Sequence, residues 1–177
     1  MNLIKTIIIS LSLLGITTIS AQSYRGSVDL GFVAGTGSLG LNRFETSVIN
    51  GLQFNDWLYA GVGVGLQVRQ PVYDLMISAP IFASIEGVLE KELLSPYFEI
   101  RLGYTITLTE FNQFCIGKEG VYFNPSVGFK WKLNGQNVMR FSTGYLLQTI
   151  NVGQNILFPF EKILRKNSLV ARVGFEF

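Results

Sequence analysis

The sequence predicts an all-β fold, an eight-stranded antiparallel up-and-down transmembrane β-barrel. Three observations predict it: few charged residues, repeated segments of about ten residues with alternating side chains, and connections that alternate between short and long. Charged residues make up 15% of the 177 residues, against about 25% in a soluble globular domain. Beyond the N-terminus there is no run of about 20 apolar residues, which a membrane-spanning helix would need. Low charge without such a run is typical of a lipid-facing barrel.

The N-terminus has the features of a secretory signal peptide. Lys5 provides the positive charge, Ile7 to Ile16 form a short apolar core, and small and polar residues lead up to Ala21. We predict cleavage after Ala21, which divides the chain into a signal peptide, residues 1–21, and an outer-membrane barrel domain, residues 22–177. The apolar core is too short for an uncleaved membrane anchor.

Eight segments of the barrel domain alternate between apolar and polar or small side chains. Successive side chains of a strand point to opposite faces, so this alternation predicts strands whose two faces meet different environments. In chain order, the first four segments set Val28, Leu30, Phe32 and Ala34 against Asp29 and Gly31; Phe44 and Val48 against Glu45 and Ser47; Leu58, Ala60, Val62, Val64, Leu66 and Val68 against Tyr59, Gly61, Gly63, Gly65, Gln67 and Arg69; and Ile77, Ala79, Ile81, Ala83 and Ile85 against Ser78, Ser84 and Glu86. The last four set Phe98, Ile100, Leu102, Tyr104 and Ile106 against Glu99, Arg101, Gly103, Thr105 and Thr107; Phe123, Val127, Phe129 and Trp131 against Asn124, Ser126, Gly128, Lys130 and Lys132; Met139, Phe141, Thr143, Tyr145 and Leu147 against Arg140, Ser142, Gly144 and Gln148; and Leu169, Ala171, Val173, Phe175 and Phe177 against Arg172, Gly174 and Glu176.

Two of these segments are irregular. Ile49 and Asn50 reverse the alternation of the second segment, which predicts a β-bulge at this point. Pro80 and Phe82 are less regular members of the fourth segment.

The connections between the segments alternate in length. Asn134-Gly135 between two alternating runs is the strongest short signal for a hairpin. Short periplasmic turns that alternate with longer external loops are expected of an outer-membrane barrel, and an even number of strands places both termini on the periplasmic side. The predicted turns are Phe54–Trp57, Leu89–Ser95 and Leu133–Gln136, and the predicted loops are Thr36–Arg43, Gln70–Leu75, Glu110–Glu119 and Asn151–Lys166.

The polar faces of the segments predict which side meets lipid. An eight-stranded barrel has an interior just wide enough for side chains, so glycine and serine there make room for long charged residues. Buried charges need partners, and the charges on these faces have both signs, so we predict that the apolar faces point outward. The alternative is a soluble, lipocalin-like barrel that encloses a ligand in an apolar interior. The predicted interior charge network consists of Asp29, Glu45, Arg69, Glu86, Glu99, Arg101, Lys130, Lys132, Arg140, Arg172 and Glu176.

Aromatic residues gather near the ends of the segments, where the interfacial girdles of a membrane barrel lie. They are Trp57, Tyr59, Phe98, Tyr104, Trp131, Tyr145 and Phe177.

The signal peptide, the eight strands and a terminal strand Ser168–Phe177 ending in phenylalanine resemble small eight-stranded outer-membrane barrels, which include the OmpX type and the transmembrane domain of OmpA. The runs GLQFNDWLYAGVGVGLQ, SPYFEIRLGY and VYFNPSVGFKW are similar to outer-membrane β-barrel domain proteins of Bacteroidota. The resemblance covers Gln22–Phe177 and implies a place among the lipids of the bacterial outer membrane. It also implies that Phe177 helps the chain to engage the barrel-assembly machinery.

The sequence offers no motif for chemistry. It contains no histidine, the commonest general base and a frequent metal ligand. Known outer-membrane barrel enzymes depend on histidine; they include lipid A deacylases, palmitoyltransferases, phospholipases and omptin-type proteases. We therefore expect no enzyme, cofactor or metal site. The glycines at 61, 63 and 65 lack the strand-to-helix context of a nucleotide-binding loop, and a net charge of +2 gives no basis for nucleic-acid binding. The single cysteine, Cys115, is expected to be a loop residue without chemistry.

One predicted loop is unusually apolar. Within NILFPFEKILRK, an exposed apolar patch would form an interaction surface for a surface partner; alternatively, the segment packs over the barrel mouth or against lipid. The patch consists of Ile156, Leu157, Phe158, Phe160, Ile163 and Leu164.

These observations favour a non-enzymatic integral outer-membrane protein with a structural or surface-interaction role. A narrow pore for small solutes is the first alternative, and the packing of the interior decides between the two. A histidine-free, lipid-modifying envelope enzyme is the second alternative.

Overall fold

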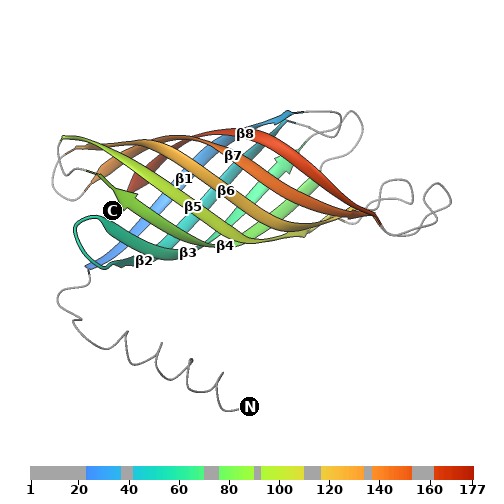
Figure 1. The fold of residues 1–177 in the computed structure, drawn as a ribbon, viewed down its shortest axis with the longest axis horizontal. Helices are drawn as coiled ribbons and strands as arrows, with labels where there is room; N and C mark the ends of the chain where they lie inside the picture. Colours follow the sequence, from blue (N-terminus) through green and yellow to red (C-terminus); the bar gives the residue numbers. More distant parts are fainter. Residues whose placement is uncertain are drawn as a thin grey trace, which may run out of the picture.

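The computed structural model describes residues 23–36, 42–69, 76–89, 93–109, 117–133, 137–152 and 162–177. Each of its strands pairs antiparallel with the next, and the last pairs with the first, so the sheet closes into a barrel of tilted strands (Figure 1). The predicted fold class is therefore confirmed. Among these residues no helix is long and apolar enough to cross a membrane. The strands are β1 (Ser23–Thr36), β2 (Arg43–Gln53), β3 (Leu58–Arg69), β4 (Met76–Val88), β5 (Leu94–Thr107), β6 (Gly117–Lys132), β7 (Val138–Val152) and β8 (Lys162–Glu176).

One end of the barrel, which we call the turn end, holds the start of β1, the C-terminal residue Phe177 and the β2–β3, β4–β5 and β6–β7 connections (Figure 1). The β2–β3 turn shows how the sequence builds it. Asn55 Oδ1 accepts hydrogen bonds from the backbone N–H groups of Trp57 (3.1 Å) and Leu58 (2.8 Å), a local bond that favours asparagine in turns. The opposite end is called the loop end below.

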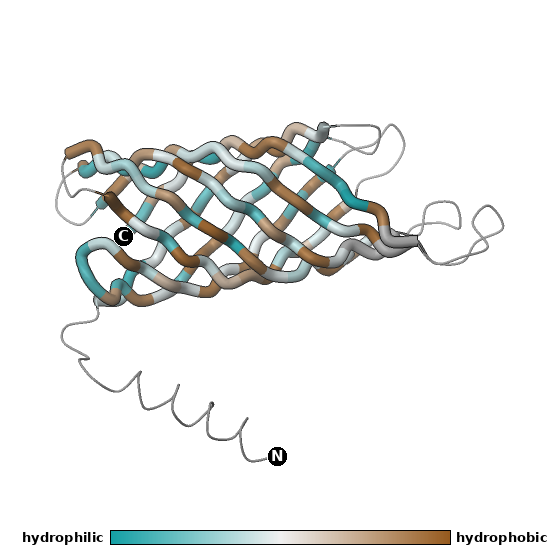
Figure 2. Tube along the Cα trace, in the orientation of Figure 1, coloured by the Kyte–Doolittle hydropathy of each residue, from teal (hydrophilic) through white to brown (hydrophobic). Residues whose placement is uncertain are grey.

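The strands keep one face inward and one outward along the barrel, as the alternation predicts. Apolar and polar residues alternate along the strands (Figure 2). In β3, for example, Gln67 is buried while its neighbours Leu66 and Val68 are exposed. The soluble alternative with an apolar ligand cavity does not fit this arrangement, because its apolar face would point inward.

The structure corrects the predicted boundary of the last loop. β7 runs to Val152 and β8 begins at Lys162, and the two pair without interruption from Val138↔Glu176 to Val152↔Lys162. Ile163 and Leu164 therefore belong to β8 rather than to a loop. Backbone pairing needs no alternation of side chains, so the ladder continues past the point where the sequence pattern ends. Ile156, Leu157, Phe158 and Phe160 lie outside the described residues, as does Cys115.

The structure also corrects the predicted bulge. β2 pairs with β1 and β3 without a register shift, Ile49 is buried in the barrel and Asn50 faces outward. The alternation reverses here because an apolar residue, Ile49, faces inward and a polar residue, Asn50, faces outward. The strand itself continues in the same register. A register shift occurs instead in β6, between Glu119 and Tyr122. There the hydroxyl of Thr149 accepts a hydrogen bond from the N–H of Val121 (2.9 Å).

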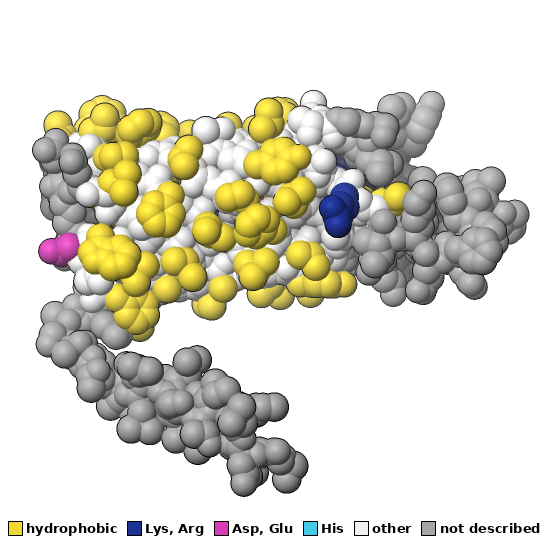
Figure 3. All heavy atoms as spheres, viewed as in Figure 1, with side chains coloured by type: hydrophobic (Ala, Val, Ile, Leu, Met, Phe, Trp, Pro, Cys, Tyr) yellow, Lys and Arg dark blue, Asp and Glu magenta, His cyan; other side chains and the backbone are white. Residues whose placement is uncertain are grey.

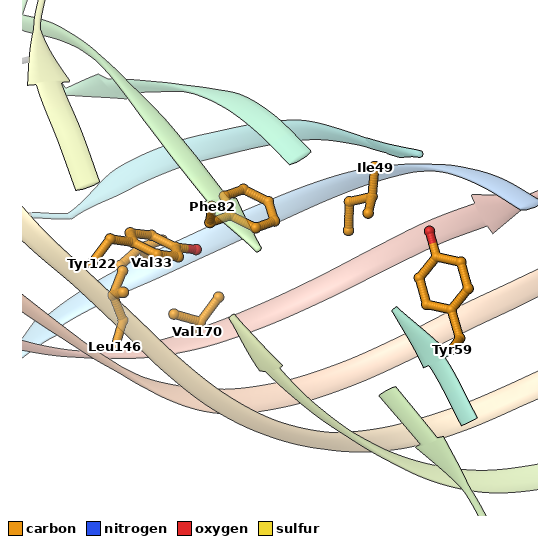
Figure 4. Close-up of a cluster of buried hydrophobic side chains, with 7 residues drawn as sticks. All are labelled: Val33, Ile49, Tyr59, Phe82, Tyr122, Leu146 and Val170. Atoms are coloured by element: carbon orange, nitrogen blue, oxygen red, sulfur yellow. The ribbon is translucent and has the colours of Figure 1, made fainter. Parts of the chain in front are cut away.

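The barrel interior contains apolar side chains as well as polar ones. Phe82 and Tyr122 stack with ring centroids 5.5 Å apart. Gly63 leaves room for this layer, because a Cβ there would lie 2.6 Å from the ring of Phe82. Figure 4 shows the set, which consists of Val33, Ile49, Tyr59, Phe82, Tyr122, Leu146 and Val170.

Candidate functional site: the barrel interior

The outer wall sets the frame for the interior. Large apolar side chains on it are exposed, from 36% for Val68 to 69% for Phe44, and they form a belt on the visible face of the barrel (Figure 3). Among the residues whose side chains the structure describes, the exposed charged ones are Asp56, Lys132 and Arg165. Asp56 lies in a turn, Lys132 ends β6, and Arg165 lies in the part of β8 near the loop end. The belt residues whose side chains are described therefore carry no charge between the two ends.

The centre of the interior is an ion-pair network around Arg101 of β5, a side chain with no exposed surface. Its guanidinium pairs with Asp29 of β1 at 2.5 Å and with Glu99 of its own strand at 3.0 Å. It also donates to the hydroxyl of Ser47 (3.1 Å), and Ser84 donates to Glu99 (2.6 Å). One arginine thus joins three strands across the lumen.

Arg140 of β7 extends this network toward the turn end. Its guanidinium lies 3.2 Å from Glu99 and 3.0 Å from Glu86, and 4.0 Å from Asp29. It also donates to the hydroxyl of Ser27 (2.9 Å). Because buried charges need partners, this sharing of carboxylates between arginines is what keeps them stable inside the wall.

A second cluster closes the lumen nearer the turn end. Glu86 and Glu176 both pair with Arg25 and Lys130, in addition to Arg140. Arg25 reaches them at 2.6 and 3.2 Å, and the Lys130 ammonium reaches them at 2.5 and 2.7 Å. The Arg25 guanidinium also lies 3.8 Å above the ring of Tyr59, a favourable cation–π arrangement.

The loop-end half holds a separate network around Glu45. Arg172 donates to Glu45 at 2.8 Å, Gln67 donates to it at 2.5 Å, and the hydroxyl of Tyr122 lies 3.3 Å from it. Arg172 also donates to Asn124 (2.6 Å). Further toward the loop end, Gln148 links Gln67, Thr105 and Arg43 at distances between 2.5 and 3.2 Å.

A cavity of about 240 Å³ opens at the turn end, and we call it the vestibule. It ends at the cluster of Glu86 and Glu176, because Glu86 and the Arg140 behind it are buried. A much smaller cavity of about 10 Å³ lies near the loop end beside Arg43 and Arg69. The polar residues that line the vestibule include Arg25, Asp56, Ser95, Lys130, Lys132 and Glu176.

Most of the residues predicted for the interior charge network are buried together inside the barrel. They are Asp29, Glu45, Glu86, Glu99, Arg101, Lys130, Arg140, Arg172 and Glu176. Arg69 is half-buried and contacts the sulfur of Met76. Lys132 was predicted for the interior but is exposed at the rim of the vestibule. It has the inward phase of Lys130, yet it stands at the last position of β6, where the wall no longer encloses it.

Sequence reasoning missed three inward cations, Arg25, Arg43 and Lys166. Each occupies an inward-facing position of its strand, one or two inward positions beyond the segment in which apolar and polar residues alternate. Arg25, for example, precedes Ser27 and Asp29 on the same face. Following the phase to the strand ends would have found them.

Tyr59 was predicted for the aromatic girdle but points into the barrel, where it is 1% exposed. Its position in β3 has the phase of Gln67, which faces inward. The other predicted girdle residues are exposed: Trp57, Phe98, Tyr104, Trp131, Tyr145 and Phe177.

Phe177 completes the seam between β8 and β1. Its backbone and that of Gly26 exchange two hydrogen bonds of 3.0 Å. The Phe177 ring covers Gly26, because a Cβ at that glycine would lie 2.8 Å from the ring. Phe177 is thus part of barrel closure.

The described residues contain no group of three or more Cys, Asp or Glu side chains placed to hold a metal ion. The interior carboxylates are instead surrounded by guanidinium and ammonium groups.

No protein-family model matches the sequence, and comparison with curated proteins finds no significant match. Solved structures do match. Neisserial surface protein A is 17% identical, with a TM-score of 0.62 over 89% of this chain and 100% of that chain. The outer membrane protein OprG from Pseudomonas aeruginosa is 12% identical, with a TM-score of 0.57 over 88% and 95%. The outer membrane enzyme PagL is 12% identical, with a TM-score of 0.50 over 82% and 97%. At these identities the likeness shows the fold alone: the chain has the closed eight-stranded barrel of small outer-membrane proteins.

Proposed function

We propose that this chain is an integral outer-membrane protein whose sealed barrel has a structural or surface-interaction role. The observation that carries the proposal is the contrast between the two surfaces of the wall. The outer surface is an apolar belt without charges, and the inner surface holds a network of buried, mutually paired charges.

The height of the belt supports a place in a membrane. On β3 the outward-facing apolar residues run from Leu58 to Val68. At a rise of about 3.3 Å per residue and a tilt of about 40°, this run is about 25 Å tall. The apolar band of outer-membrane barrels is also about 25 Å tall. The exposed aromatic residues Trp57 and Trp131 lie at the turn end of this belt, where interfacial aromatics are expected.

The packing of the lumen favours a sealed barrel over a narrow pore. Glu99, Arg101 and Arg140 occupy the centre with at most 2% exposure, and the stacked Phe82 and Tyr122 form an apolar layer beside them. An ion would have to break several buried ion pairs to pass this section. The vestibule ends before it.

The fold does not decide between a binding protein and an enzyme, since PagL is an outer membrane enzyme. We rank the enzyme below the binding protein because the sequence has no histidine and the interior carboxylates are held in ion pairs. Comparing lipid A and phospholipids of a deletion strain with those of the parent tests this: a changed lipid would favour the enzyme.

Two further parts of the proposal follow the resemblance to small outer-membrane barrels. The turn end, with both chain ends of the mature protein, faces the periplasm. Phe177 serves as the terminal aromatic that the barrel-assembly machinery engages, in addition to closing the seam. A surface-interaction role would belong to the loop end.

The decisive experiment is outer-membrane fractionation combined with gel mobility before and after heating. We expect the protein in the outer-membrane fraction, with a folded form that migrates differently from the heated form. A protein that stays in the soluble fraction contradicts the proposal. Planar-bilayer recordings of the refolded protein test the sealed lumen, and stepwise single-channel conductance would support the pore instead.

A further inference from the structure

The vestibule is a separate feature from the sealed centre of the barrel. It is open at the turn end, where Figure 1 shows the C-terminus, and it closes at the Glu86–Glu176 cluster. Its volume of about 240 Å³ equals the share of about eight water molecules at about 30 Å³ each. It is therefore large enough for a small solute and too small for a polymer.

The cations of the vestibule have more N–H donors than their carboxylate partners use. Lys130 donates to Glu86 and Glu176, which leaves one of the three N–H groups of an ammonium. Arg25 uses Nη1 for Gln53, Nη2 for Glu86 and Nε for Glu176, which leaves two of the five N–H groups of a guanidinium.

Lys132 adds a third cation at the rim. It is exposed and lines the vestibule, and it makes no ion pair with another described residue. The acids of the lining are already engaged, because Glu176 holds Arg25 and Lys130 and Asp56 has an interaction of its own. A ligand that fits this lining must supply several acceptor oxygens and negative charge.

We propose that the vestibule binds a small solute that carries a phosphate group. A phosphate presents several strongly accepting oxygens in a tetrahedral arrangement, so it can accept from Arg25, Lys130 and Lys132 at once. The three cations come from β1 and β6, and Arg25 of β1 and Lys130 of β6 meet at the same two carboxylates. The buried pairs with Glu86 and Glu176 hold Arg25 and Lys130 in position before a ligand arrives, which reduces the entropy lost on binding.

This inference goes beyond the structural role proposed above, and it does not depend on whether the barrel conducts. The lining carries three cations and two acids, so we expect weak, saturable binding rather than tight capture. Lys132 is the residue to change, because it is exposed and is not part of the ion pairs that stabilise the barrel.

The test is isothermal titration of the refolded mature protein in detergent with inorganic phosphate, at constant ionic strength set with chloride. We expect saturable binding that Lys132→Gln weakens about tenfold, the effect of losing one charge-assisted hydrogen bond. Arg165→Gln is the matched control, since Arg165 is an exposed cation near the loop end, and it should leave the affinity unchanged. A normal heat-dependent mobility shift of each variant verifies that it is folded.

Three results overturn the inference. They are the absence of saturable binding to folded wild-type protein, an equal loss in Lys132→Gln and Arg165→Gln, and binding of chloride that matches binding of phosphate. None of these results affects the outer-membrane fractionation, so a failure here is distinguishable from a failure of the proposed function.

Discussion

The inner and outer surfaces of the barrel wall are built on the same strands and differ in almost every other respect. On β3, Val62 and Val64 are exposed on the outer surface, while Gln67 and Tyr59 are buried on the inner one. The outer surface is uniform, and its residues differ mainly in size. The inner surface is specific, because the charges of its networks meet particular partners from other strands, as Arg101 meets Asp29 across the lumen.

The difference shows that this small barrel reverses the arrangement of a soluble globular protein, in which apolar residues lie inside and charged residues lie outside. A small soluble domain takes its stability from an apolar core, whereas here the lumen holds most of the charges that the structure describes. Substitutions on the outer surface should therefore act through transfer to lipid, and those on the inner surface through lost partners. The predictions below test that distinction in order of expected effect.

The largest effect is expected from Arg101→Met. The change removes a cation with no exposed surface and leaves Asp29 and Glu99 with fewer partners. Breaking a buried ion pair in this way destabilises a protein by about 3–5 kcal/mol. Urea unfolding of the protein in lipid vesicles measures the free energy of unfolding.

Arg165→Met is the control for this variant, because it removes an exposed arginine and should change the free energy of unfolding by less than about 1 kcal/mol. An equally small loss for Arg101→Met would mean that water reaches the centre of the lumen. In that case the inner surface would behave as a solvated channel wall, and the sealed barrel would be wrong.

The second effect is expected on the outer surface, from Val64→Arg. Val64 is 54% exposed near the middle of the belt. Arginine on the lipid face of a barrel costs about 2–4 kcal/mol at the bilayer midplane and almost nothing near the interfaces. The free energy of unfolding should fall by that amount in vesicles, with Val64→Leu unchanged as the control. A Val64→Arg variant as stable as the wild type would place Val64 outside the hydrocarbon.

The strand pattern could be predicted because one face of each strand meets lipid, which forces apolar residues into every second position. The paired charges could be predicted for the same reason, since they hold the opposite phase, as Glu99 and Arg101 do in β5. The inward apolar residues could not be found by chemistry alone. Ile49 and Phe82 resemble outer residues in type and differ from them only in phase.

The ends of the strands could not be predicted from the sequence either. Beyond the belt both faces meet polar surroundings, so the alternation that marks a strand ends before the strand does. Arg25 and Lys166 were missed for that reason, and the residues from Lys162 to Lys166 were assigned to a loop. The vestibule could not be predicted either, because its shape depends on how far each strand extends at the turn end.

A smaller effect is expected from Gly63→Ala. The added Cβ would lie 2.6 Å from the ring of Phe82 and 3.1 Å from Ile49, and overpacking of this kind costs about 1–3 kcal/mol. Phe82→Leu removes the ring, so the double variant should lose less stability than the sum of the two single variants. Additive losses in the four-variant cycle of urea unfolding would show that Gly63 and Phe82 do not share the same space.

The smallest effect tests where the belt ends, at a polar contact on the outer surface. Tyr24 donates to Asn50 Oδ1 at 2.6 Å, and both side chains are exposed on the wall near the turn end. If this contact lies in lipid, Tyr24→Phe leaves the Asn50 amide without its partner, and the free energy of unfolding should fall by about 1 kcal/mol. Asn50→Leu should then be stabilising, because it removes an amide from lipid, and the double variant should recover the loss. If the contact lies in water, Tyr24→Phe should have almost no effect and Asn50→Leu no benefit. The sign of the Asn50→Leu effect in vesicles therefore decides whether the apolar belt includes this contact or ends on its loop-end side.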